Sequence, residues 1–163
     1  MQRLLMISAL VLSAWVSAAE TEDSPPLINL TFGQVGIERH VENPWRYGIE
    51  YRLRPFGEYR LVPSLGFAWV ENGANYLYGE LRRDFAFPSG VLLTPSFGLG
   101  AFDGSSEFRL GKTLEFRTGI EIAYRFPGRY RLGLALFHMS NGGLGKENPG
   151  AEALVLSFSA PIR

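Results

Sequence analysis

The chain has 163 residues, and its 16 lysines and arginines are balanced by 16 aspartates and glutamates. It therefore lacks the excess basic charge that binding to nucleic-acid phosphates requires, which excludes nucleic-acid partners. Cysteine is absent, which excludes a disulfide framework, a thiolate metal site and a thiol nucleophile. The 19 Gly, 12 Phe, 7 Tyr and 3 Trp favour short strands and turns over helices.

Residues 1–19 have the layout of a secretory signal peptide. Arg3 precedes an apolar run from Leu4 to Val16, and small residues follow at 17–19. The run is about half a dozen residues short of the ~20 that a membrane-spanning helix needs, and no later window supplies one. Cleavage would leave about 144 residues, which suits a single domain over residues 20–163. Any membrane span must then be made of strands.

Eight segments alternate between apolar and small or polar residues with the period of two that indicates a β-strand. In the sixth, Phe108 and Leu110 are predicted on the apolar outer face and Arg109 on the polar inner face. An even number of strands of about ten residues, separated by turn residues, is typical of an outer-membrane barrel. We therefore expect an all-β fold, an eight-stranded antiparallel transmembrane β-barrel. Its strands should cover residues 27–37, 45–54, 59–69, 75–87, 90–102, 108–125, 130–140 and 152–160.

Tight turns at 54–59, 87–90 and 126–130 are predicted to face the periplasm, and the looser connections the cell exterior. Alternation alone also fits a soluble lipocalin-like barrel with its apolar stripe inside around a ligand, but the leader, the strand length and two aromatic belts favour the membrane. The extracellular belt should contain Trp45, Tyr47, Trp69, Tyr76 and Phe108, and the periplasmic belt Tyr59, Phe85, Tyr124 and Tyr130.

Charged residues of the inner face are predicted to interlock as ion pairs. A barrel of eight strands has room for side chains in its lumen and little else, so a pore is not expected. The predicted lumen charges are Arg46, Glu50, Arg52, Glu80, Arg82, Arg109, Glu115, Arg117, Glu121 and Arg125.

Polar residues interrupt the apolar stripe on the last two strands. His138, one of two histidines, and Ser140 continue the lipid-facing stripe of the seventh strand, and Glu152 begins that of the eighth. A carboxylate that faces hydrocarbon is unfavourable unless it has a partner. Antiparallel pairing brings the end of one strand beside the start of the next, so the three side chains are expected to converge.

This trio has the composition of a nucleophilic catalytic site. A serine hydroxyl attacks well only when an imidazole takes its proton, and a carboxylate supports that imidazole. The Asn141 side chain and the N–H groups of Gly142 and Gly143 are candidates to hold the oxyanion. A structural interpretation also exists, because Asn-Gly and Asn-Pro-Gly are common turn sequences and a strand histidine can be merely interfacial.

The sequence His-x-Ser-Asn-Gly-Gly, followed by Asn-Pro-Gly-x-Glu, resembles the lipid A 3-O-deacylase family, PagL. The resemblance is strongest from Leu134 to Phe158. It implies an eight-stranded outer-membrane barrel that hydrolyses the acyl chain ester-linked at position 3 of lipid A, without a metal or organic cofactor. It also implies a triad of His138, Ser140 and Glu152, with Asn141 in the oxyanion hole. The C-terminus at 159–163 departs from many outer-membrane barrels in lacking a terminal aromatic residue.

Alternatives remain at this stage. The same triad permits acyl transfer to a second lipid if water is excluded, and a non-enzymatic barrel would serve as an adhesin or membrane anchor. Glu147 is an alternative orienting acid to Glu152, while Lys146 and Arg39 are candidates to meet lipid A phosphates. The sequence leaves open the preferred acyl length and whether the barrels pair as homodimers.

Overall fold

The computed structural model describes residues 24–37 and 43–162, most of which lie in antiparallel strands. The predicted leader at residues 1–19 and the candidate Arg39 lie outside the described residues. No helix in the described part of the chain is long and apolar enough to cross a membrane. The elements are β1 (Leu27–Val35), β2 (Trp45–Arg52), β3 (Leu61–Val70), β4 (Asn75–Arg83), β5 (Phe85–Ala86), β6 (Val91–Asp103), β7 (Leu114–Arg125), the 3₁₀ helix η1 (Pro127–Arg129), β8 (Arg131–Ser140) and β9 (Ala151–Pro161).

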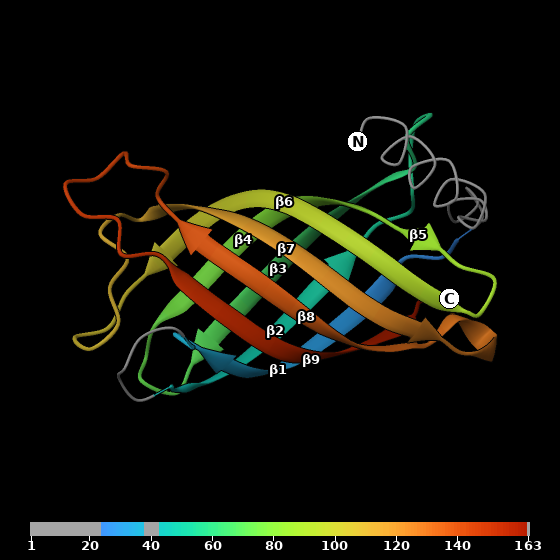
Figure 1. Ribbon diagram of the computed structural model, residues 1–163, viewed down its shortest axis with the longest axis horizontal. Coiled ribbons are helices and arrows are strands. Elements are labelled where there is room, and N and C mark those ends of the chain that lie inside the picture. Colours follow the sequence, from blue (N-terminus) through green and yellow to red (C-terminus); the bar gives the residue numbers. More distant parts are fainter. Residues whose placement is uncertain (1–23, 38–42, 163) are drawn as a thin grey trace, which may run out of the picture.

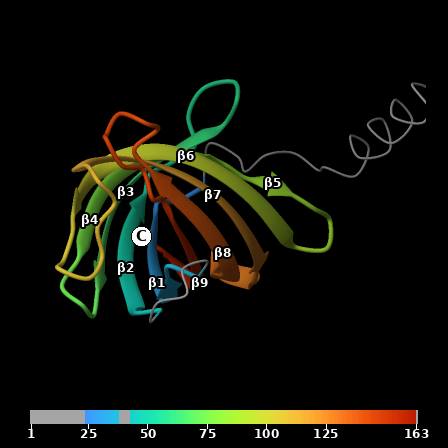
Figure 2. The same cartoon turned by 60° about the vertical axis from the view of Figure 1, so that its left-hand side comes forward.

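The strands close into a barrel (Figure 1), and Figure 2 shows them running round the ring. Apart from β4 and β5, strands adjacent in the chain pair with each other, and β1 pairs with β9. The two-residue β5 follows β4 after Asp84, and both pair with β6, so β4 and β5 act as one strand of the wall. The predicted eight-stranded antiparallel barrel is therefore confirmed. Closure pairs each of the eight wall strands with a neighbour on both sides over the described residues, so the barrel has no open sheet edge there of the kind that promotes aggregation.

The two faces of the wall differ in polarity, and the outer face is the apolar one. On β8, the outward Leu132, Leu134 and Leu136 are about half exposed, whereas the inward Ala135 and Phe137 are buried. A soluble barrel with a ligand inside would bury the apolar stripe. The lipocalin-like alternative is therefore wrong.

Charged side chains fill the lumen and neutralise one another. Glu121 accepts a hydrogen bond from Arg52 (Nη2–Oε2 2.7 Å) and also pairs with Arg82, while Arg52 Nε lies 2.6 Å from Glu50 Oε1. One predicted member does not face the lumen, because Arg109 lies exposed on the β6–β7 connection. Arg125 has the inward parity of Glu121 but is only half-buried, at the end of β7. The others are buried: Arg46, Glu50, Arg52, Glu80, Arg82, Glu115, Arg117 and Glu121.

The connections 104–113 and 141–150 emerge at one end of the barrel, on the left in Figure 1, which we call the loop end. Inside this end, apolar side chains that include Phe102, Phe108 and Leu110 form a cluster. The prediction that Phe108 and Leu110 face outward is therefore wrong, since they are only 5% and 1% exposed. Gly111, at φ 91°, interrupts the extended backbone, and β7 begins only at Leu114.

Aromatic residues stack on the outer face near the loop end. The Trp45 ring lies 4.7 Å from that of Phe32, and the Tyr47 ring lies 5.7 Å from that of Trp69. These three predicted belt members are exposed. Tyr76 was predicted in the same belt but is buried, because its position on β4 has inward parity, and its hydroxyl donates to the Glu115 carbonyl at 2.8 Å.

Candidate active site

His138 and Glu152 meet on the outer face of the barrel. They are direct cross-strand partners in the antiparallel ladder of β8 and β9. His138 Nδ1 lies 2.7 Å from Glu152 Oε1, which is hydrogen-bond distance. The side chains are 48% and 22% exposed, respectively. This contact holds the ring by Nδ1, and Nε2 bonds no described residue.

Ser140 ends β8, two residues after His138 and on the same face of the strand. Residues so spaced lie about 7 Å apart at Cα. Ser140 is half-buried, and its cross-strand partner on β7 is Phe116. Its hydroxyl makes no hydrogen bond to any described residue. The structure thus joins His138 to Glu152 and places Ser140 beside them, without a bond between the hydroxyl and the imidazole. Catalytic contacts often tighten only when substrate is bound.

Gly150, just before β9, packs against the imidazole. A Cβ at this position would lie 3.2 Å from His138 Cε1, and the backbone has φ 62°, where glycine is favoured. The sequence predicted a turn at 148–150 but not this packing. The signal that points to it is the register, since Gly150 immediately precedes the partner of Met139, Ala151.

The segment expected to hold an oxyanion begins the β8–β9 connection. Asn141 is fully buried, and its Nδ2 donates to the carbonyl oxygens of Leu110 at 3.0 Å and of Glu147 at 2.8 Å. Gly142 and Gly143 follow with φ 61° and 79°. The bond to Leu110 was not anticipated from the sequence, because it joins two connections that are 31 residues apart.

The other candidates of this connection make no hydrogen bond to the imidazole. Glu147 contributes its carbonyl to Asn141, whereas the carboxylate bonded to His138 belongs to Glu152. Lys146 is exposed. Among the described residues, no group of three or more His, Asp or Glu side chains is arranged to hold a metal ion.

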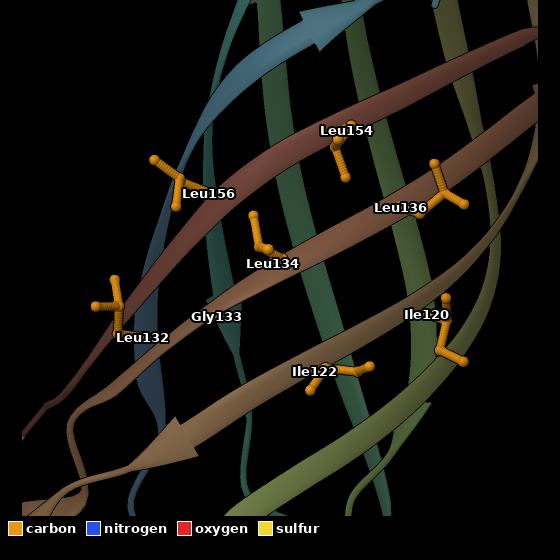
Figure 3. Close-up of a pocket in the computed structure, with 8 residues that line it drawn as sticks. All are labelled: Ile120, Ile122, Leu132, Gly133, Leu134, Leu136, Leu154 and Leu156. Carbon is orange, nitrogen blue, oxygen red and sulfur yellow. The ribbon is translucent and has the colours of Figure 1, made fainter.

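An apolar hollow of about 470 Å³ lies on the outer face of β7, β8 and β9 (Figure 3). Leu136 and Leu154, which are cross-strand partners, form the end nearest to His138 and Glu152. We call this hollow the outer groove. It is lined by Ile120, Ile122, Leu132, Gly133, Leu134, Leu136, Leu154 and Leu156.

Comparisons with known proteins identify similar proteins across nearly the whole chain. A family model described as "Lipid A 3-O-deacylase (PagL)" matches residues 31–161. The Lipid A deacylase PagL of Pseudomonas aeruginosa is 24% identical over 171 residues, covering 97% of this chain and 96% of its own length.

Solved structures are similar in fold. The crystal structure of the outer membrane enzyme PagL has a TM-score of 0.67 at 22% identity, covering 83% of this chain and 99% of its own. A de novo designed transmembrane β-barrel has a TM-score of 0.61 at 12% identity, covering 88% of this chain and 99% of its own. At such low identity these likenesses show the barrel fold alone.

Proposed function

The chain belongs to the lipid A 3-O-deacylase (PagL) family, and we propose that it hydrolyses the 3-O-linked acyl ester of lipid A with a triad of Ser140, His138 and Glu152. Membership makes it an ester hydrolase and an outer-membrane β-barrel. The proposal concerns which residues carry the reaction and how the substrate reaches them.

The observation that carries the proposal is the 2.7 Å contact between His138 Nδ1 and Glu152 Oε1 on the outer face. Ionisable groups among outward-facing leucines are energetically unfavourable, so their presence there points to a function. A carboxylate on one imidazole nitrogen, with a serine hydroxyl on the same face, is the arrangement that activates a nucleophile.

In the proposed reaction, Ser140 Oγ attacks the ester carbonyl carbon while His138 Nε2 takes the hydroxyl proton. Glu152 holds the ring through Nδ1 and stabilises the imidazolium. A hydrogen-bond donor of the segment Asn141–Gly143 stabilises the oxyanion. Collapse of the intermediate breaks the bond to the sugar oxygen, which receives the proton from His138. Water then attacks the acyl-serine with His138 as base, and the fatty acid leaves.

The outer groove supports this assignment of substrate. In a barrel embedded in the outer membrane, its apolar outer face meets the acyl chains of lipids, and the loop end faces the cell exterior. An acyl chain that lies along the leucines of β8 and β9 brings its ester end to His138 and Glu152, because the groove ends one cross-strand pair away. We infer that the hydrolysed chain occupies this groove.

Mass spectrometry of lipid A from cells that express Ser140→Ala tests the proposal. The unmutated chain should remove one hydroxyacyl group and release it as free fatty acid, whereas Ser140→Ala should leave lipid A intact. Ser106→Ala, at an exposed serine of the β6–β7 connection, is the matched control and should retain activity.

Each rival function has its own result in this assay. Transfer of the acyl group to a second lipid, instead of its release, would indicate an acyltransferase. Unchanged lipid A in cells that produce the unmutated, correctly assembled chain would indicate a structural or adhesive barrel. Deacylation by Ser140→Ala would show that the triad is wrong.

A further inference from the structure

Asn141 is the most heavily hydrogen-bonded residue of the candidate site. Its Nδ2 donates to Leu110 O (3.0 Å) and Glu147 O (2.8 Å), and its Oδ1 accepts from Gly143 N (3.1 Å). Its own N–H donates to Asn148 Oδ1 at 3.0 Å. A primary amide has two N–H donors, so both donors of this side chain are already occupied by main-chain carbonyls. Its buried position gives it no exposed surface from which to reach a substrate.

The backbone after Asn141 forms a tight turn. Leu144 N donates to Asn141 O at 3.1 Å, and the central residues Gly142 and Gly143 both have positive φ, at 61° and 79°. This is a type I′ turn, which favours glycine at both central positions. The N–H groups of Gly143 and Leu144 are occupied within the turn, whereas that of Gly142 bonds no described residue.

Gly142 also lies close to the nucleophile candidate. A Cβ on Gly142 would lie 3.1 Å from Cε2 of Phe116, and Phe116 is the cross-strand partner of Ser140. The unoccupied N–H therefore belongs to the residue two positions after Ser140, beside the ring that flanks Ser140 on β7. The Asn141 side chain is directed instead into the junction of two connections.

We propose that Asn141 is a positioning residue and that the main-chain N–H of Gly142 is the donor that stabilises the oxyanion. This inference rests on the proposed function. As the bond from Ser140 Oγ to the carbonyl carbon forms, the C=O π electrons move to the oxygen, and that oxygen accepts a hydrogen bond from Gly142 N. Asn141 acts through the turn, which it holds against the β6–β7 connection.

A substitution at Gly111 distinguishes this positioning role of Asn141 from direct donation of a hydrogen bond by its side-chain amide. A Cβ at Gly111 would lie 2.4 Å from Glu147 O and 3.2 Å from Asn141 Nδ2, so Gly111→Ala disturbs the junction while the amide remains. Gly73→Ala is the matched control, because Gly73 has a similar φ of 94° in another connection and open space around it.

The first test compares kcat and KM for Gly111→Ala, Asn141→Ala and the double variant in the full-length barrel. Positioning predicts that each single change lowers kcat at least about tenfold with little change in KM, and that the double variant is no slower than the slower single one. Gly73→Ala should keep the unmutated kcat. Circular dichroism and gel mobility confirm barrel assembly, and Asn148→Ala replaces Gly111→Ala if the latter does not assemble.

A different pattern of kcat values would contradict the positioning role of Asn141. If Gly111→Ala keeps kcat within about twofold of Gly73→Ala while Asn141→Ala loses about 10²-fold, the amide itself donates and the proposal is wrong.

The second test replaces Gly142 by glycolic acid in a chemically ligated chain, which exchanges its N–H for an oxygen and adds no side chain. We expect kcat to fall about 10²–10³-fold with KM retained, and an unchanged kcat overturns the role of Gly142. Ser140→Ala is measured alongside. If Ser140→Ala remains active, the proposed function has failed. If it is inactive but Gly142 and Gly111 are neutral, only this inference has failed.

Discussion

The inner and outer faces of the wall formed by β7, β8 and β9 each carry a carboxylate bonded to a basic side chain, in opposite surroundings. Inside, Glu121 is buried and accepts from Arg52, Arg82 and the Ser157 hydroxyl. Outside, the carboxylate of Glu152 bonds a single side chain among the described residues, His138, which is about half exposed.

This difference separates two roles of charge in one fold. A buried charge that loses its partner is strongly destabilising, so the shared pairs of the lumen keep the barrel interior filled and neutral. A single pair close to the loop end, near the water boundary, such as His138 and Glu152, contributes about 0–1 kcal/mol to stability. His138 and Glu152 therefore have little structural value, and the free imidazole nitrogen is available for chemistry. Substitutions on each face test whether the roles are in fact separate.

The largest effect is expected on the outer face, from His138→Ala. Loss of the proton acceptor should lower the deacylation rate about 10⁴-fold or more, as it does in other serine–histidine–carboxylate triads. The free energy of unfolding should change by no more than ~1 kcal/mol, because the side chain is half exposed. The rate is measured on purified protein with lipid A, and stability by urea unfolding followed by tryptophan fluorescence. A rate within tenfold of the unmutated value would contradict the catalytic role of the pair.

The converse is expected on the inner face, from Glu121→Ala. Its removal leaves Arg52 and Arg82 short of a buried partner, which should lower the free energy of unfolding by ~3–5 kcal/mol. The kcat of the folded fraction should be retained, since Glu121 faces away from the site. The control Glu58→Ala, in the exposed turn after β2, should change stability by less than ~0.5 kcal/mol. A large loss of kcat in Glu121→Ala would mean that the two faces are coupled.

The same contrast explains which parts of the fold could be predicted from the sequence. Alternation with a period of two identified the strands and placed Glu121 inside and His138 outside, because side-chain direction in a strand follows parity alone. It failed at Phe108 and Leu110, which continue the apolar alternation but lie in a connection that fills the loop end of the barrel. Parity does not reveal where a strand stops when the loop is itself apolar.

The candidate site, too, has one part that the sequence predicted and one that it did not. The approach of His138 to Glu152 could be predicted, because two strands that follow each other in the sequence pair as a hairpin. The bond of Asn141 to Leu110 did not, because it depends on how two separate connections pack. Asn141 therefore looked like a free donor in the sequence, although both of its amide hydrogens are occupied in the structure.

A smaller effect tests whether the outer face is uniform. Leu136→Trp places a bulky ring in the outer groove, one cross-strand pair from His138, whereas Leu65→Trp places the same ring on β3, outside the groove. If the acyl chain lies in the groove, Leu136→Trp should lower kcat/KM for a long-chain ester about tenfold, mainly through KM, since pocket contacts of this size are worth about 1–3 kcal/mol. A four-carbon ester should be affected little, because it does not reach past the first pair. Both leucines are exposed to a similar degree, so general effects of tryptophan at the lipid boundary cancel between the two variants. Equal KM values for the long-chain ester would mean that the chain binds elsewhere on the barrel.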